Sequence, residues 1–470
     1  MQKATLIASP YFIGFRKNIP TSLARATFEF ALRLHPVSVS TFLPSQLEQI
    51  ALESGFDGAG WATAEIPQTA VDDYELWLQQ GRHAGMDYLP RQLERKSNLS
   101  PFTHVLVLGI SHAFAAPEKP SGGTRVGRVA KYAWTPDYHS QLSPRLERIV
   151  AAAQKLGLKA KAYVDHGPVL ERMLGARAFL GWRAKSGMLV SQKLGAFLTL
   201  AVVLVEGLDE EGFSGELGSG GVGVRGSRGA EESTLALDFS SSETPPVRLL
   251  SFSPPPPLLL SPPLSSVPAP STQSNKNAHP DRCGTCTRCV SSCPTNAIQN
   301  DRTLDARVCI SYLTIEHRGP VALELRPHIG NWLFGCDVCL EVCPWSVKAG
   351  DIAQNWQPDP ELVYPDLEPF FTLSSRQFER LYAGTALSRA RRKGMARNAC
   401  TVLGNSRDEQ HLGLLERAAQ DEAWEVREAA AWAFSRVGGK RALNLLERML
   451  SDANERVQGR VTWALELENG

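Results

Sequence analysis

Cys283-Gly-Thr-Cys286-Thr-Arg-Cys289-Val-Ser-Ser-Cys293-Pro294 is the stretch that decides the fold around it in this chain of 470 residues. Cys336-Asp-Val-Cys339-Leu-Glu-Val-Cys343-Pro344 follows, and Cys309 lies between the two stretches. Eight of the nine cysteines thus fall between positions 283 and 343, and only Cys400 stands apart. The first stretch has the spacing C-x2-C-x2-C-x3-C-P, which is typical of modules that bind iron–sulfur clusters.

In such modules three cysteines of one stretch bind one [4Fe–4S] cluster, and the fourth cysteine ligates the other cluster. The second stretch lacks one cysteine at the usual spacing, and Cys309 can supply it. We expect these ligands for the first cluster: Cys283, Cys286, Cys289 and Cys343. We expect these for the second: Cys293, Cys309, Cys336 and Cys339. The alternative is a pair of zinc sites, which need four ligands each. Cys400 is expected to be a small buried hydrophobic residue.

Composition indicates the compartment. Tight Cys-x-x-Cys groups in a long chain without a secretory signal indicate metal binding rather than a disulfide framework, so we expect a cytoplasmic protein. No apolar run is long enough to span a bilayer, which predicts no membrane segment. Lysine plus arginine, at 50, nearly balances aspartate plus glutamate, at 49, so an anionic partner would need a local basic patch.

Shifts in composition divide the chain. We expect an N-terminal extension at 1–40, a mixed domain at 41–206, a Gly/Ser/Pro-rich insertion or linker at 207–278, the cysteine module at 279–350, a connecting segment at 351–388 and helical repeats at 389–470. The extension is poor in acidic residues, so a transit peptide and a plain or mis-started extension both stay open. Low apolar content predicts that the linker is disordered.

Within the mixed domain, hydrophobic patterns predict helices at 45–54, 142–156 and 169–179, and strands at 104–110, 161–164 and 197–205. This alternation of strands and helices favours an α/β layer architecture. Near the C-terminus, three similar helical segments begin at Met395, Val426 and Val457, about thirty residues apart, and two of them end in Trp-Ala-hydrophobic. They predict stacked HEAT-like repeats rather than a simple bundle.

Several stretches together resemble the epoxyqueuosine reductase family, which depends on cobalamin and iron–sulfur clusters. They are Tyr132-Ala-Trp-Thr-Pro-Asp-Tyr-His139, Val164-Asp-His-Gly-Pro-Val-Leu-Glu-Arg172, Leu180-Gly-Trp-Arg-Ala-Lys185, Asp305-Ala-Arg-Val-Cys-Ile-Ser-Tyr-Leu-Thr-Ile-Glu316, Gly330-Asn-Trp-Leu-Phe-Gly-Cys-Asp337 and Pro344-Trp345. The resemblance covers about 41–206 and 279–470. It implies an α+β multidomain protein: a cobalamin-binding α/β domain like that of reductive dehalogenases, a ferredoxin-like double [4Fe–4S] module and C-terminal HEAT-like repeats.

The resemblance also implies a reaction. Electrons from an external low-potential donor would pass through the clusters to cobalamin, and epoxyqueuosine in tRNA would be reduced to queuosine. The residues that match family cobalamin contacts are Arg95, Asp165, Lys185, Leu189, Leu200, Ser311, Cys336 and Asp337. Opening an epoxide leaves an alkoxide that needs a proton, so Asp165 is the expected acid, with burial raising its pKa. Its alternative role is a cap on the helix near Pro168.

Two groups of basic residues could contact tRNA phosphates. They are Arg389, Arg391, Arg392, Lys393 and Arg397 at the start of the repeats, and Arg307, Arg318 and Arg326 near the cysteines. No sustained heptad is present, so a monomer is expected. The chain departs from the family pattern at 199–206, at His166 and in the long low-complexity segment, which is an insertion or a sequence artefact. A reductive dehalogenase and a non-catalytic electron-transfer subunit are the alternative functions.

Overall fold

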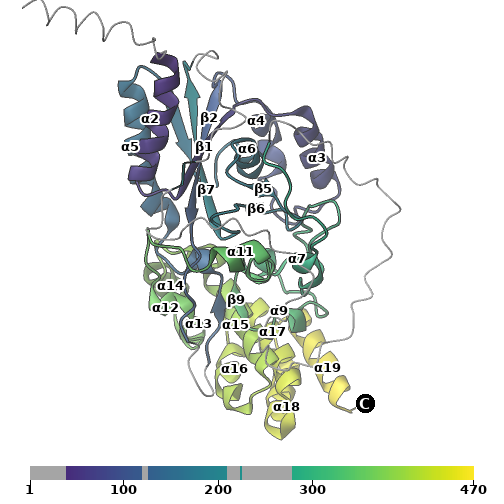
Figure 1. The fold of residues 1–470 in the computed structure, drawn as a ribbon. Helices are drawn as coiled ribbons and strands as arrows, with labels where there is room; N and C mark the ends of the chain where they lie inside the picture. Colours follow the sequence, from purple (N-terminus) through teal and green to yellow (C-terminus); the bar gives the residue numbers. More distant parts are fainter. Residues whose placement is uncertain (1–38, 119–124, 209–222, 225–277, 470) are drawn as a thin grey trace, which may run out of the picture.

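The computed structural model describes residues 39–118, 125–208, 223–224 and 278–469 (Figure 1). Almost all of the predicted N-terminal extension and of the segment 207–278 lies outside these ranges, so both interpretations stay predictions. Figure 1 shows a helix-covered sheet at one end, short cysteine-bearing helices in the middle and paired helices at the other end.

A five-stranded sheet forms the first region. Its order is β4-β7-β2-β1-β8, and all neighbouring strands pair antiparallel. The strands are β1 (Gly58–Thr63), β2 (His104–Ser111), β4 (Lys159–Tyr163), β7 (Leu198–Glu206) and β8 (Gly223–Val224). The three predicted strands are therefore confirmed, including β7, where the sequence departs from the family pattern.

Helices cover both faces of this sheet, which explains why most residues of its central strands are buried. Successive side chains of a strand point to opposite faces. On β2, Leu106 and Leu108 belong to the core that includes residues of α2 (Val39–Glu53) and α5 (Tyr138–Lys155). Val105 and Val107 of the same strand belong to the opposite core, with residues of α6 (Glu171–Arg177).

The remaining elements of the first region are α3 and several short helices and strands. They are α3 (Gln68–Gln79), η1 (Pro90–Gln92), α4 (Leu93–Ser97), β3 (Arg128–Val129), η2 (Lys131–Ala133), β5 (Trp182–Arg183) and β6 (Leu189–Val190). β5 and β6 form an antiparallel pair of their own. β3 leaves the first region and pairs parallel with a strand of the cysteine module, so the two regions share a small sheet.

The cysteine module is built from single-turn helices. Its elements are α7 (Arg288–Ser291), α8 (Ile310–Ile315), α9 (Arg326–Ile329), β9 (Trp332–Phe334), α10 (Val338–Glu341) and α11 (Pro344–Ala349). β9 is the strand that pairs with β3, and Phe334 lies opposite Val129. This pairing fixes the loop after β9, which carries Cys336 and Asp337, against the first region.

Paired helices complete the chain. They are α12 (Pro360–Val363), α13 (Pro369–Thr372), α14 (Ser375–Leu381), η4 (Ala386–Ala390), α15 (Arg391–Ser406), η5 (Glu409–His411), α16 (Leu412–Ala418), α17 (Trp424–Val437), α18 (Gly439–Arg448), η6 (Met449–Ser451) and α19 (Glu455–Asn469). α15, α17 and α19 contain the three predicted similar segments and stack in that order (Figure 1).

Small residues allow these helices to approach closely. A Cβ added at Gly404 of α15 would lie 2.7 Å from the Trp432 ring and 2.9 Å from the Cα of Ala433 on α17. Cys400 is fully buried in the same core, as predicted. No helix in the described ranges combines the length and the apolar character needed to cross a membrane.

Candidate active site and cluster-binding cysteines

The eight clustered cysteines fall into two spatial groups. None of them forms a disulfide, and all are half-buried. The thiol of Cys289 interacts electrostatically with those of Cys283, Cys286 and Cys343. The thiol of Cys339 interacts with those of Cys293, Cys309 and Cys336. The structure thus brings together the same two sets of four that the sequence predicts, although the ligand assignment itself stays a prediction.

The surroundings of these thiols suit iron–sulfur clusters. Trp182 Nε1–H donates to Cys283 Sγ at 3.4 Å, and the Ala297 amide donates to Cys293 Sγ at 3.3 Å. Hydrogen bonds to sulfur are among the features that set cluster potentials. Among the described residues, no three His, Cys, Asp or Glu side chains are close enough to hold a single metal ion.

Asp165 lies in the loop between β4 and α6, two residues after the end of the edge strand β4. Its backbone is left-handed, with φ of 57°, and its carboxylate accepts a hydrogen bond from the Tyr138 hydroxyl. The helix after it begins at Glu171 with Leu170 as its N-cap, so the alternative role of Asp165 as a helix cap is wrong. The predicted burial is also wrong, because Asp165 is exposed. It can therefore meet a ligand.

Two tyrosines connect Asp165 to the cysteine module. Burial, together with the charge of Asp165, raises the pKa of Tyr138 and of Tyr132, so both phenols stay protonated and can donate. Their ring centroids are 6.2 Å apart. Tyr132 also interacts with Asp337, which follows Cys336 of the second cysteine group. Asp165 and Asp337, from different regions, thus both act on one tyrosine.

Asp337 is fixed by a contact across the two regions. It is buried, and its carboxylate accepts a hydrogen bond from the Lys131 amide at 2.7 Å. Burial raises the pKa of Asp337 to about 7. Since Lys131 directly precedes Tyr132, this bond sets the distance between the tyrosines and the second cysteine group.

The start of the helical repeats contributes to the outer edge, or rim, of the site. Arg389 of η4 donates to Glu316 at 2.5 Å and also donates to the Tyr88 hydroxyl oxygen. Tyr88 also interacts electrostatically with Asp165. The sheet region, the cysteine module and the start of the repeats therefore all meet around Asp165.

The other predicted cobalamin contacts lie in several places. Ser311 is half-buried on α8, and Arg95 is exposed on α4. Leu189 is buried in the core beside α6, and Leu200 packs on that core from β7. Lys185 Nζ donates to the carbonyls of Gly284 and Cys286, at 2.7 and 3.0 Å, so it contacts the loop of the first cysteine group. These residues stay predicted contacts.

Sequence reasoning missed Tyr138, Glu171 and Lys96 as members of the site. Tyr138 and Glu171 lie within stretches that resemble the family, and Lys96 follows the predicted contact Arg95. No spacing rule identified them, because their position depends on how α4, α5 and α6 meet.

Part of the predicted basic surface is internal, which corrects the sequence interpretation. Arg326 is buried and pairs with Glu428 at 2.7 Å, and buried Arg392 pairs with Asp421 at 2.6 Å. Buried Arg397 donates to the carbonyls of residues 313, 317 and 319. These three arginines join the repeats internally or to the cysteine module.

Exposed basic residues remain near the site: Arg307, Arg318, Arg389 and Arg391.

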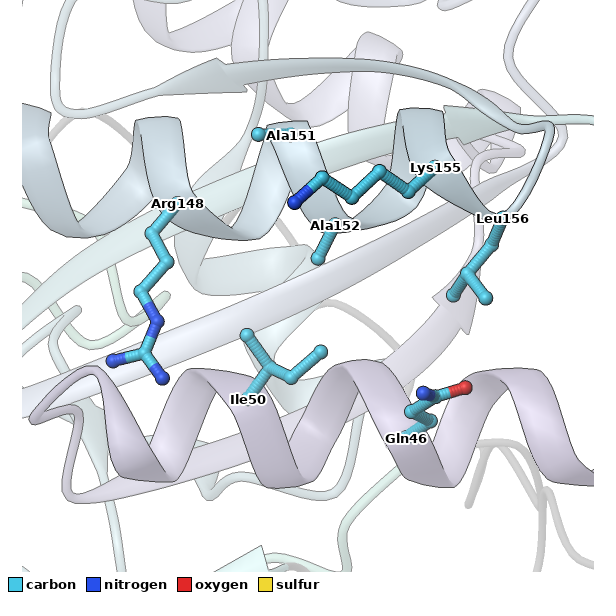
Figure 2. A pocket seen from close by; sticks show the side chains of 7 residues that line it. All are labelled: Gln46, Ile50, Arg148, Ala151, Ala152, Lys155 and Leu156. Atoms are coloured by element: carbon cyan, nitrogen blue, oxygen red, sulfur yellow. The ribbon is translucent and has the colours of Figure 1, made fainter. Parts of the chain in front are cut away.

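A separate groove between α2 and α5 has a volume of about 360 Å³ (Figure 2). Ile50 and Arg148 are among the residues that line it, and no candidate site residue does.

Gly335 allows the close approach of the two regions. Its φ is +71°, and an added Cβ would lie 2.5 Å from the Cβ of Ala130, next to Lys131. Gly335→Ala should therefore lower the thermal midpoint and the iron content. The left-handed backbone costs a substituted residue about 1–2 kcal/mol, and the overlap adds about 1–3 kcal/mol.

Gly384→Ala is the matched control for this prediction. Gly384 has nearly the same φ, of +70°, but an added Cβ there meets no atom within 4 Å. Thermal unfolding and iron analysis of both variants would separate overlap from backbone strain. Equal losses in the two variants would contradict the role of close approach.

Comparison with known proteins places these features in one family. Residues 282–346 match a 4Fe-4S double cluster binding domain, 384–466 match HEAT repeats, and 94–166 match the family "Epoxyqueuosine reductase QueG, DUF1730". The double cluster module, the HEAT-like repeats and the fold class are therefore confirmed, whereas the domain boundaries stay predictions.

Among curated relatives, the epoxyqueuosine reductase of Pseudomonas aeruginosa is 30% identical, over 84% of this chain and 95% of its own. That of Xanthomonas campestris is 30% identical, over 84% of this chain and 96% of its own.

Solved structures of the family have the same fold. An epoxyqueuosine reductase with an epoxyqueuosine-modified tRNA-Tyr stem loop has a TM-score of 0.70 at 23% identity, covering 92% of this chain and all of that one. The Bacillus subtilis enzyme, with an aspartate-bearing catalytic loop swung out of its active site, has a TM-score of 0.70 at 23% identity, covering 91% of this chain and 99% of that one. The chain described here belongs to the epoxyqueuosine reductase family.

Proposed function

We propose that this chain reduces epoxyqueuosine to queuosine at the wobble position of tRNA. The observation that supports this most is that Asp165 and Asp337, the residue after Cys336, both interact electrostatically with Tyr132. A proton source and the loop of the second cysteine group therefore lie near the same tyrosine. The related enzymes named above act on the same tRNA nucleoside or carry their catalytic aspartate on a loop.

The reaction needs two electrons and two protons. Both carbon–oxygen bonds of the epoxide break, a carbon–carbon double bond forms, and the oxygen leaves as water. When bound, cobalamin reduced through the two [4Fe–4S] clusters would supply the electrons. Residues proposed to contact cobalamin are Asp165, Ser311, Cys336 and Asp337, with Arg95, Lys185, Leu189 and Leu200 as further candidates.

In this proposal Asp165 protonates the oxygen as the epoxide opens. Its exposure suits this role, because the substrate has to reach the carboxyl group. Tyr138 holds the carboxyl group through its hydroxyl and is protonated itself, so it fixes the orientation of the acid. A positioned acid typically accelerates such a step about 100- to 10,000-fold.

Several partners belong to the same proposal. Exposed Arg318, Arg389 and Arg391 would bind tRNA phosphates, which predicts affinity that falls with salt. The modified nucleoside would be extruded from its stack to reach Asp165. We further propose an external low-potential electron donor, a monomeric state and a cytoplasmic location.

The test uses full-length protein purified without oxygen. Absorption spectra should show a bound corrinoid, and nucleoside mass spectrometry should show conversion of epoxyqueuosine to queuosine in tRNA with a chemical reductant. A bound corrinoid with no conversion would reject this substrate and favour a dehalogenase. Clusters without corrinoid or conversion would favour an electron-transfer subunit.

A further inference from the structure

The loop that carries Asp165 has little support of its own. Residues 164–170 join β4 to α6, and within the loop the His166 amide donates to the Val164 carbonyl at 2.6 Å. Asp165 holds a left-handed backbone that a residue with a side chain rarely adopts. A catalytic group in such a backbone needs contacts from outside the loop to keep its position.

Lys96 of α4 supplies such contacts. Its side chain is buried, and Nζ donates to the carbonyl oxygens of Gly167 at 3.3 Å and of Val169 at 2.9 Å. Both acceptors are backbone atoms of the loop, two and four residues after Asp165. Since a buried ammonium group is strongly disfavoured without partners, the lysine and the loop carbonyls depend on each other.

Glu171 is the first residue of α6, directly after the loop, and it interacts electrostatically with Lys96 and Asp165. Its Oε1 is buried and has no hydrogen-bond partner among the described residues. Burial raises the pKa of Glu171 to about 7, while the charge of Lys96 acts in the opposite direction. Glu171 and Asp165 repel each other when both are ionised, and Lys96 attracts both. Lys96 thus offsets the repulsion between two carboxylates at the ends of one short loop.

We infer that Lys96 is a positioning residue that fastens the Asp165 loop through the Gly167 and Val169 carbonyls, with the half-buried Glu171 as its counter-charge. This inference rests on the proposed function, because it concerns the placement of the proposed acid. Lys96 acts through the backbone of the loop, so its loss should reduce the reaction rate rather than the affinity for tRNA.

The test compares Lys96→Met, which keeps the length of the chain but removes all donors, with Lys96→Arg, which keeps them. In Lys96→Met, hydrogen exchange of the backbone amides in 164–170, which exclude Pro168, should become at least about tenfold faster. The kcat on epoxyqueuosine tRNA should fall about 10- to 100-fold, since small misplacements of a catalytic group have effects of that size. The KM for tRNA should stay within about twofold, and Lys96→Arg should recover part of both losses.

Arg91→Met is the matched control, because Arg91 is an exposed basic residue of the preceding turn. It should leave exchange and kcat unchanged. The double variant Lys96→Met/Glu171→Gln guards against misfolding, since it leaves no unpaired buried charge. It should show the same faster exchange as Lys96→Met.

Unchanged exchange of 164–170 in folded Lys96→Met would overturn the inference, and so would faster exchange with unchanged kcat. Exchange is measured without turnover, so it decides the fastening of the loop even if the protein does not act on epoxyqueuosine. Failure of the proposed function would instead appear as missing conversion in the unsubstituted protein.

Discussion

Asp165→Asn should lower turnover of epoxyqueuosine tRNA about 100- to 10,000-fold, which is the usual contribution of a positioned acid. Asparagine has nearly the same shape, and its side-chain oxygen can still accept the hydrogen bond from the Tyr138 hydroxyl. It has no carboxyl proton to give. The loss should therefore appear in single-turnover rates per bound corrinoid, measured by nucleoside mass spectrometry, with iron content and tRNA affinity unchanged.

Tyr138→Phe is the companion variant. It removes the hydroxyl that holds Asp165 but keeps the carboxyl group, so we expect a smaller loss of up to about tenfold, in line with the net value of one hydrogen bond. Full turnover by Asp165→Asn, with clusters and corrinoid intact, would remove Asp165 from the mechanism. An equal loss in the two variants would indicate that tyrosine, not aspartate, is the acid.

Local patterns predicted much of the fold. The apolar run of β2 and the amphipathic pattern of α5 depend on burial along one strand or one helix face, which a sequence displays directly. α5 begins at Tyr138, four residues before the predicted start, because Asp137 caps it by accepting from the His139 amide. The equal spacing of α15, α17 and α19 could also be predicted, because each helix has a similar local sequence pattern.

The order and direction of the strands in the sheet could not be predicted from the sequence. Alternating strands and helices favoured an α/β layer, with Asp165 at the end of a strand. The structure has an antiparallel sheet with β4 at its edge, so the position of Asp165 follows from the β4–α6 loop and not from the rule for parallel sheets. Strand order depends on contacts between distant segments, and one sequence does not display them.

The positions of basic residues in the sequence predicted the exposed surface of the site poorly. Arg389, Arg392 and Arg397 are close in sequence, but Arg389 is exposed at the rim while the other two are buried. Whether an arginine meets water, a carboxylate or a carbonyl is decided by the packing of α15 against its neighbours. The same limit hid Lys96, whose partners lie more than seventy residues away.

Removal of cysteines in pairs should have the largest effect on the cofactors, and it tests how the two stretches share them. If ligands are exchanged between the stretches, Cys289 and Cys343 serve one cluster, as the electrostatic contact between their thiols suggests. Cys289→Ser/Cys343→Ser should then lose that cluster completely and keep about four of eight irons. Cys289→Ser/Cys293→Ser should damage both clusters, because it removes one ligand from each.

The opposite outcome belongs to stretches that each hold their own cluster. In that arrangement Cys289→Ser/Cys293→Ser would keep one intact cluster, and Cys289→Ser/Cys343→Ser would damage both. Iron analysis and electron paramagnetic resonance of the reduced proteins distinguish the cases, with Cys400→Ala as the control that keeps all irons. The sharing of cysteine ligands between the two stretches matters for function because it joins both clusters into one unit. The loop of Cys336 and Asp337 then cannot move away from Tyr132 without straining the cluster that the first stretch binds.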